Sequence, residues 1–188
     1  MVVVGIDEVG RGSWAGPLTV SAVAISTPIP GLRDSKKLTI LKRNLLESEI
    51  KRLALAIGIG WASSTEIDKL GLTKALNLAT KRAIDQIDIQ IDQIIIDGNV
   101  NFLPEDKRVK TVIKADAIIP SVSAASIIAK VSRDKWMKDV AASLYPGYGF
   151  EKNVGYGTAF HQLALQKYGI CKIHRKSFQP IKNIDRGL

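Results

Sequence analysis

Residues 2–12 read VVVGIDEVGRG, and this short stretch decides the fold. Its first five residues are mostly β-branched, which is typical of a strand buried on both faces. The run ends at Asp7 and Glu8, and a glycine-rich turn follows. We therefore expect a central strand that delivers two carboxylates to one end of a sheet.

Strand and helix patterns follow one another along the rest of the chain. Further strands are expected over residues 18–25, 55–61, 94–96 and 109–113, and helices over residues 39–53, 73–87, 121–144 and 158–168. Gly58 and Gly60 interrupt one of these strands, which indicates that another part of the backbone passes close to it. The order predicts a layered α/β fold with residues 1–188 as one domain and residues 183–188 as a frayed tail.

The composition favours a nucleic-acid partner. The chain has 27 Lys and Arg against 18 Asp and Glu, and its formal net charge of +9 favours binding to phosphate-rich polymers. Cys171 is the only cysteine, which excludes an internal disulfide and a cysteine-based zinc site. The sequence shows no secretory signal and no apolar run long enough to span a membrane. We therefore expect a cytoplasmic monomer that binds nucleic acid and no membrane.

Two more of the expected strands end at carboxylates. Residues 94–96 lead into Asp97, and the strand at residues 109–113 leads toward Asp116. Strands that run in the same direction bring their carboxyl ends to one edge of a sheet, so Asp97 can meet the two acids of the first strand. Crowded carboxylates repel one another unless cations lie between them, and oxygen ligands favour Mg²⁺ or Mn²⁺.

Such an acidic site is suited to phosphodiester hydrolysis. Two divalent ions can activate water and stabilise the leaving oxygen without a histidine base, and neither His161 nor His174 lies beside a strand-end acid. One difficulty is that neighbouring side chains on a strand point to opposite faces, so Asp7 and Glu8 share a site only if the strand bends. The glycines of the following turn favour such a bend.

Two other functions remain open at this point. Glycines after a first strand can cradle a nucleotide phosphate, but the spacing of Gly10, Gly12 and Gly16 departs from the common phosphate-binding patterns. A non-catalytic RNA-binding module is the second alternative, since aromatic residues near Lys152 can stack on bases. Such a module would not require acids at the strand ends.

Short motifs spread along nearly the whole chain carry a further signal. They read GIDEVGRG (residues 5–12), AGP (15–17), DSKKL (34–38), DGN (97–99), KAD (114–116), SAASIIAKVSRD (123–134), GYGT (155–158) and IHRKSF (173–178). In these segments the chain resembles ribonuclease HII, the prokaryotic family of RNase H type 2 enzymes. Ser13 and Trp14, which follow the opening motif, depart from the family pattern.

The resemblance implies an RNase H-like fold, in which a mixed central β-sheet is flanked by α-helices. It implies two divalent ions, Mn²⁺ or Mg²⁺, held by four catalytic acids, which are Asp7, Glu8, Asp97 and Asp116. It also implies a set of substrate-binding residues, which are Gly10, Arg11, Gly12, Ser35, Lys36 and Tyr156. In the family, the Gly-Arg-Gly segment recognises the ribonucleotide 2′-hydroxyl, and the tyrosine packs at the RNA–DNA junction.

The implied activity is cleavage of the RNA strand of RNA–DNA hybrids. It includes incision on the 5′ side of a single ribonucleotide embedded in duplex DNA, leaving 5′-phosphate and 3′-hydroxyl ends. The residue types are consistent with this, because glycines let backbone groups approach the sugar edge where RNA and DNA differ. Arg11 can then hold the adjacent phosphate.

Overall fold

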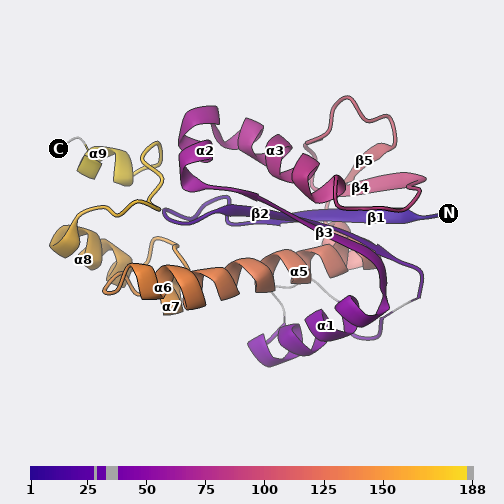
Figure 1. Ribbon diagram of the computed structural model, residues 1–188, viewed down its shortest axis with the longest axis horizontal. Helices are drawn as coiled ribbons and strands as arrows, with labels where there is room; N and C mark the ends of the chain where they lie inside the picture. Colours follow the sequence, from indigo (N-terminus) through magenta and orange to yellow (C-terminus); the bar gives the residue numbers. More distant parts are fainter. Residues whose placement is uncertain (28, 33–37, 186–188) are drawn as a thin grey trace.

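A mixed five-stranded sheet forms the centre of the molecule (Figure 1). The computed structural model describes residues 1–27, 29–32 and 38–185, and within these the strand order is β3-β2-β1-β4-β5. The strands are β1 (Val3–Val9), β2 (Leu18–Ile25), β3 (Ala54–Ala62), β4 (Gln93–Asp97) and β5 (Val109–Val112). β1 runs antiparallel to β2 and parallel to β4, which confirms the mixed sheet.

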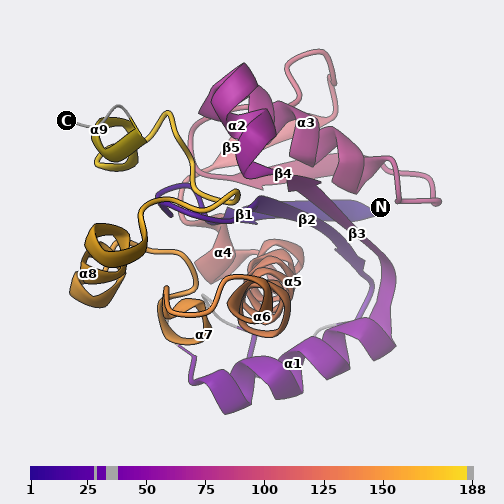
Figure 2. The ribbon, with the colours of Figure 1, turned by 60° about the vertical axis from the view of Figure 1, so that its left-hand side comes forward.

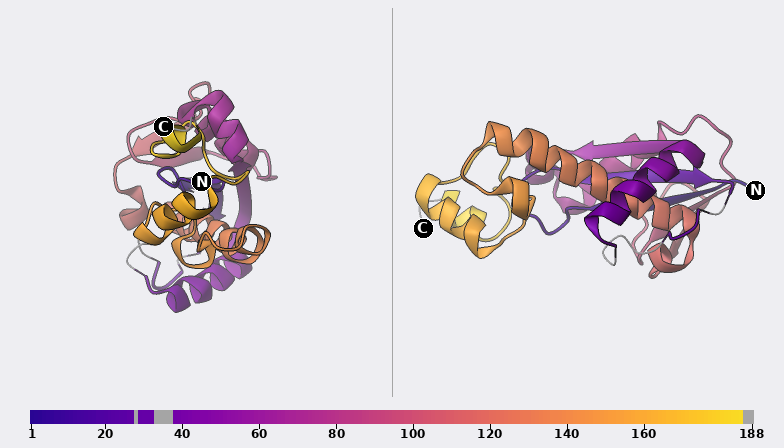
Figure 3. Two further views of the ribbon diagram at one scale, coloured as in Figure 1. Left: turned by 90° about the vertical axis from the view of Figure 1, so that its left-hand side faces the viewer. Right: turned by 90° about the horizontal axis from the view of Figure 1, so that it is seen from below.

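Helices cover both faces of this sheet (Figure 2). α2 and α3 lie on one face and α1 and α5 on the other, while α8 and α9 lie beyond one end of the sheet (Figure 3). The helices are α1 (Ile40–Leu53), α2 (Ser64–Leu70), α3 (Leu72–Ile84), α4 (Ala115–Ile118), α5 (Pro120–Trp136), the π-helical η2 (Met137–Ala141), α6 (Ala142–Leu144), α7 (Phe150–Asn153), α8 (Ala159–Tyr168) and α9 (Ile181–Asp185). No helix among the described residues is long and apolar enough to cross a membrane.

Two predicted helices have clearly different bounds in the structure, and four short helices, α2, α4, α7 and α9, were not predicted. The helix expected over residues 121–144 is divided, because the π-helical turn η2 separates α5 from α6. The helix expected over residues 73–87 ends at Ile84, beyond which the side chain of Gln86 bonds to the backbone of β3. α2 was missed because seven residues are too few to show a helical period, although its capping box marks its start.

The tail predicted over residues 183–188 is helical up to Asp185. These residues belong to α9, whose first residue Ile181 is buried in the cluster of apolar side chains around α7 and α8. Burial of Ile181 ties the start of this turn to the body of the molecule, and fraying from residue 183 stays a prediction. Residues 186–188 lie outside the described part of the chain.

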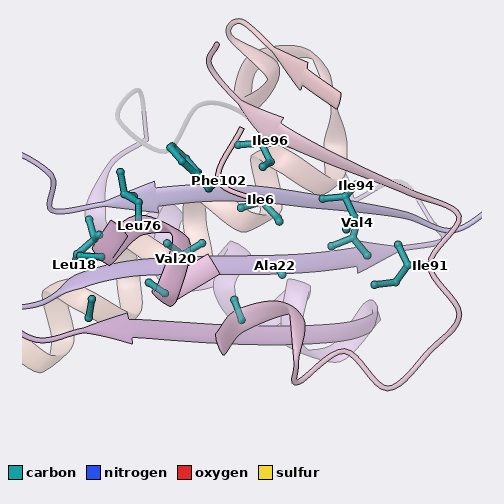
Figure 4. Close-up of a cluster of buried hydrophobic side chains, with 14 of the residues drawn as sticks. Val4, Ile6, Leu18, Val20, Ala22, Leu76, Ile91, Ile94, Ile96 and Phe102 are labelled. Atoms are coloured by element: carbon teal, nitrogen blue, oxygen red, sulfur yellow. The ribbon is translucent and has the colours of Figure 1, made fainter. Parts of the chain in front are cut away.

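The core is built on the alternation of side chains along β1. Val4 and Ile6 point into a cluster of buried apolar side chains between the sheet and α3 (Figure 4). Gly5 faces α5, where an added β-carbon would lie 2.2 Å from the backbone carbon of Ser121 and the backbone nitrogen of Val122. The backbones of β1 and α5 therefore touch directly, two residues before Asp7.

The two glycines of β3 have the role predicted for them. A β-carbon on Gly60 would lie 1.8 Å from the carbonyl oxygen of Ala79, and one on Gly58 would lie 1.9 Å from that of Ala83. Both carbonyls belong to α3, so this helix packs directly on the strand backbone. The prediction that another part of the backbone passes close to these glycines is confirmed.

Candidate active site

The first and fourth strands carry their acids to the same edge of the sheet. β1 and β4 are parallel, and their last matched pair is Ile6 with Ile96. Asp7 and Asp97 each follow that pair by one residue, so they lie at equivalent places on neighbouring strands. The parallel order thus produces the meeting of strand-end acids that the sequence predicts.

Asp7 is buried, and the pKa of its carboxyl group is strongly raised. Its side chain is 9% exposed, and its Oδ1 accepts the backbone N–H of Glu8 at 2.8 Å. Burial raises the pKa of Asp7 to about 8, and the nearby charges of Glu8 and Asp97 add to this rise, while a hydrogen bond from Ser126 opposes it. The ionised form of Asp7 is therefore costly unless a cation lies nearby.

Glu8 lies beside Asp7 and is also largely removed from water. Its side chain is 10% exposed, and Oε1 accepts a hydrogen bond from Nη1 of Arg11 at 3.0 Å. Oε2 is buried and has no hydrogen-bond partner among the residues that the structure describes. Burial raises the pKa of Glu8, Arg11 lowers it in part, and Asp97 raises it further. An orphaned carboxylate oxygen among like charges is the chemistry expected of a cation ligand.

The expected bend between the two acids is absent, which corrects one inference from the sequence. β1 continues through Val9 with regular pairing to β2, and the left-handed turn at Gly10 comes only afterwards. Both acids can still interact with Asp97, because the pairing with β4 ends at Ile6. Beyond Ile6, no strand in the described part of the chain pairs with this side of β1.

Asp97 connects this edge to the fourth acid. Its Oδ1 accepts the backbone N–H groups of Ala115 at 2.7 Å and Asp116 at 3.4 Å, so it caps the start of α4. Lys114 adopts a left-handed conformation, with φ of 59°, and turns the chain from β5 into this helix. The hydroxyl of Ser123 donates to the carbonyl oxygen of Asp116. Asp116 is therefore held next to Asp97 through its own backbone.

The four acids share one edge but do not form a closed cage. Among the described residues, no three His, Cys, Asp or Glu side chains converge as a ready-made metal site. What the structure brings together is a set of carboxylate oxygens in which burial raises the pKa of Asp7 and Glu8 and one oxygen of Glu8 has no partner among the described residues. This donor set fits a hard divalent cation such as Mg²⁺ or Mn²⁺.

The glycine-rich loop after β1 is held by a buried arginine of α5. Arg133 is fully buried and donates hydrogen bonds to the carbonyl oxygens of Pro17 at 2.8 Å and Ala15 at 3.1 Å. It also donates to the hydroxyl of Ser13 at 2.8 Å, and that hydroxyl donates to the carbonyl of Gly10. The departure from the family pattern at Ser13 is therefore accommodated inside the loop.

A second buried arginine holds the same loop from the C-terminal side. Arg175 donates to the carbonyl oxygens of Gly16 at 3.1 Å and Arg11 at 3.0 Å, while its Nη2 has no partner in the described part of the chain. Burial lowers the pKa of Arg175 to about 9, and the charge of Arg133 contributes to this. The loop is thus fixed by two cations that have no carboxylate partner among the described salt bridges.

The structure places Tyr156 beside this loop. The backbone N–H groups of Trp14 and Ala15 both donate to the carbonyl of Gly155, at 2.8 and 3.2 Å. The guanidinium of Arg133 lies 5.5 Å from the centre of the Tyr156 ring. The side chain of Arg11 is half exposed, and a β-carbon on Gly12 would meet no atom within 4 Å. The side chain of Arg11 and the backbone at Gly12 are therefore accessible on the described surface of the loop.

Two of the predicted substrate-binding residues lie outside the described part of the chain, and three residues that contact the site were not predicted to do so. Ser35 and Lys36 lie outside the described residues. Arg133, Arg175 and Ser126 were not assigned roles at this site. A signal for Arg133 is present, because it continues a stripe of buried alanines along α5 at a spacing of four residues.

Comparison with known proteins identifies the family. A family model for Ribonuclease HII matches residues 4–181. The chain belongs to the ribonuclease HII family. It is therefore a nuclease of the RNase H type, which confirms the resemblance and excludes the nucleotide-binding enzyme and the non-catalytic RNA-binding module.

Individual members of the ribonuclease HII family and its relatives support this. The ribonuclease HII of Enterococcus faecalis is 45% identical over 185 residues, which make up 97% of this chain and 71% of that protein. The ribonuclease H2 of Pyrococcus horikoshii OT3 has a TM-score of 0.83 at 27% identity, covering 100% of this chain and 98% of that one. Bst-RNase HIII, crystallised in complex with Mn²⁺, shares the fold with a TM-score of 0.74 at 20% identity, covering 99% and 70% of the two chains. The RNase H-like fold is confirmed.

Proposed function

We propose that this chain hydrolyses the RNA strand of RNA–DNA hybrids and incises duplex DNA on the 5′ side of a single embedded ribonucleotide. The observation that carries the proposal is the buried, unpartnered Oε2 of Glu8 beside Asp7 and Asp97. An acidic edge of this kind on a chain of net charge +9 suits a cation-dependent enzyme for a polyanion. A single-domain monomer in the cytoplasm completes the proposal.

Four acids would hold the ions, and these acids come from three different elements of the fold. Asp7 and Glu8 come from β1, Asp97 comes from β4, and Asp116 comes from α4. Two bound Mg²⁺ or Mn²⁺ ions supply activation of water and neutralisation of the leaving oxygen, giving 5′-phosphate and 3′-hydroxyl ends. The Mn²⁺ complex of Bst-RNase HIII supports this choice of ion.

The chain's own residues orient the substrate around this edge. The open backbone at Gly12 admits the sugar edge of a ribonucleotide, and the half-exposed guanidinium of Arg11 can take the neighbouring phosphate. The ring of Tyr156, next to the same loop, offers an apolar face at the RNA–DNA junction. In this proposal the loop recognises ribose, while the acids act on the phosphodiester on its 5′ side.

The proposal is tested with defined duplexes. Purified protein is incubated with Mg²⁺ or Mn²⁺ and with a DNA duplex that carries one internal ribonucleotide, an all-DNA duplex of the same sequence and a long RNA–DNA hybrid. Incision of the first and third substrates, on the 5′ side of the ribonucleotide, is the expected result. Cleavage of the hybrid alone would retain RNase H activity and reject single-ribonucleotide incision, and inactivity on both would reject the proposal.

Metal binding is expected to strengthen as the pH rises. Because the pKa of Asp7 is raised to about 8, this carboxyl holds a proton at neutral pH, and a cation must displace it. Affinity for Mn²⁺ should rise roughly tenfold per pH unit between pH 5 and 7, with release of about one proton per binding event, and should level off above pH 8. Calorimetry in buffers of different ionisation enthalpy measures both quantities. Equal affinity at pH 6 and pH 8 would contradict the prediction, and Asp7→Asn should abolish the proton release.

Replacement of Arg11 is expected to affect recognition more than folding. Arg11→Ala removes a charge-assisted contact to phosphate, so kcat/KM on the single-ribonucleotide duplex should fall about tenfold. It also removes the cation that lowers the pKa of Glu8, so the acid limb of the pH–rate profile should move to higher pH.

Arg108→Ala is a matched control for this variant. Arg108 is similarly exposed and also binds a carboxylate, that of Asp106, but it lies next to the opposite end of the strands. Its replacement should change neither the rate nor the pH profile. An Arg11→Ala enzyme that keeps its preference for the ribonucleotide duplex would remove Arg11 from recognition.

A further inference from the structure

Two histidines form a buried pair at a distance from the acids. His161 lies in α8 and His174 in the segment after it, and their side chains are 0% and 1% exposed. Their Nε2 atoms are 3.0 Å apart. Neither ring takes part in the chemistry proposed above, so the pair requires another explanation.

The hydrogen bonds around the pair fix which nitrogen carries each proton. Nδ1 of His161 lies 3.0 Å from the carbonyl oxygen of Tyr156, which can only accept, so this Nδ1 is protonated and Nε2 is not. Nδ1 of His174 lies 2.8 Å from the backbone N–H of Cys171 and 3.3 Å from the Cys171 carbonyl oxygen. Because Nε2 of His161 is bare, the bond between the two Nε2 atoms needs the proton of His174 on Nε2, so its Nδ1 accepts the shorter bond from the Cys171 N–H. The N–H of His174 therefore donates to the bare Nε2 of His161.

These bonds form one directed chain from Cys171 through His174 and His161 to Tyr156. The arrangement requires both rings to be neutral, since an added proton would set two N–H groups against each other. Burial lowers the pKa of both histidines, that of His174 to about 4, so the chain is intact at neutral pH. Its end point is the backbone of the tyrosine that lies beside the glycine-rich loop.

The same pair is connected to the glycine-rich loop on its other side. His174 pairs with Ala15 in an isolated β-bridge, and the flanking bonds join Gly16 N–H to the carbonyl of Ile173 and Arg175 N–H to that of Trp14, both at 2.8 Å. The Tyr156 carbonyl meanwhile accepts a second bond, from the N–H of Thr158, at 2.9 Å. The histidines thus connect the strand that holds the loop to the turn that holds Tyr156.

We propose that His161 and His174 are positioning residues that fix Tyr156 relative to the glycine-rich loop, residues 10–16, for recognition of the RNA–DNA junction. The inference rests on the proposed function, in which that loop recognises ribose and Tyr156 meets the next nucleotide. Packing alone would not need directed bonds, since the surrounding rings of Trp14, Tyr148 and Phe150 could enclose an apolar side chain equally well. An apolar residue at position 174 would leave the N–H of Cys171 without its acceptor.

A matched pair of variants separates positioning from packing. The side-chain amide of asparagine reaches the place of Nδ1, so His161→Asn keeps the donor to Tyr156 and loses the bond to His174. Glutamine reaches the place of Nε2, so His161→Gln keeps the bond to His174 and loses the donor to Tyr156. Both variants replace the ring by an amide, so unfolding measurements should give similar losses of stability.

The readout is kcat/KM on the single-ribonucleotide duplex divided by kcat/KM on the long hybrid. His161→Gln should lower this ratio about tenfold, and His161→Asn should lower it less than threefold. The same substitution made in Tyr156→Ala should change the ratio less than twofold, because a residue that acts through Tyr156 has nothing left to position. Nitrogen-15 spectra should show the proton on Nδ1 of His161 and on Nε2 of His174.

Three results would each overturn the positioning role. The first is an equal kcat/KM ratio for His161→Gln and His161→Asn, and the second is a drop of about tenfold in the ratio when His161→Gln is made in Tyr156→Ala. The third is a spectrum that shows the proton on Nε2 of His161 and on Nδ1 of His174. A wild-type chain that does not incise the single-ribonucleotide duplex would instead reject the proposed function. The unmodified protein therefore tests the function, and the comparison of variants tests the inference.

Discussion

Asp97→Asn is expected to lower hydrolysis of an RNA–DNA hybrid about 1000-fold, equivalent to about 4 kcal/mol of transition-state stabilisation, while the fold remains intact. Activity and stability should respond differently because Asp97 has two separate roles, one in capping α4 and one in carrying a negative charge. One oxygen accepts the N–H groups of Ala115 and Asp116, and an asparagine oxygen can still accept them. The negative charge, which a divalent ion requires, is lost.

The measurement is kcat/KM together with the free energy of unfolding from chemical denaturation. Asp97→Ala is the control, because it removes the charge and also leaves the start of α4 without its cap. It should be as inactive as Asp97→Asn but less stable by about 1 kcal/mol. Full activity of Asp97→Asn would exclude Asp97 from the metal site.

Gly5→Ala is expected to cost about 3 kcal/mol of folding free energy, an unusually large effect for one added methyl group. The new β-carbon would lie 2.2 Å from backbone atoms of Ser121 and Val122, and backbone cannot move aside as a side chain can. The strand and α5 would have to separate. Asp7 lies two residues further on and bonds to Ser126 of the same helix, so the acidic edge should be disturbed as well.

Gly12→Ala is the matched control for stability, because a β-carbon there meets no atom within 4 Å. Its unfolding free energy should stay within about 1 kcal/mol of the wild-type value. Thermal and urea unfolding of the two variants measure the difference. A Gly5→Ala protein as stable as Gly12→Ala would mean that β1 and α5 are not in direct backbone contact.

The strands and their acids were predictable because the signal is local. β-branched runs that stop at an acid place β1 and β4, and the parallel-edge rule then brings Asp7 and Asp97 together. The helices α2, α4, α7 and α9 were not predictable from periodicity, since each is too short to show a helical period. The π-helical turn after α5 was missed because residues 121–144 are compatible with one continuous helix.

The contacts by which Arg133 and Arg175 hold the glycine-rich loop were beyond local patterns. Arg133 and Arg175 donate to carbonyls 116 to 164 residues away along the chain, so neither a window of sequence nor a spacing rule can reveal the contact. The regular course of β1 through Val9 was also unpredictable. It depends on the pairing of β1 with β2, which continues to Val9 after the pairing with β4 has ended at Ile6.

The large sequence separation of these arginine contacts also has a consequence for the order of folding. Contacts between distant parts of a chain carry a large loop-closure cost and tend to form after local ones. The helices and the β1–β2 hairpin can form early, whereas the glycine-rich loop is expected to become ordered only when Arg133 and Arg175 dock against it. Discrimination between RNA and DNA is therefore expected to be a late-acquired property of the folding chain. Pulse-labelled hydrogen exchange at the Gly16 amide, compared with amides of β1, would follow it directly.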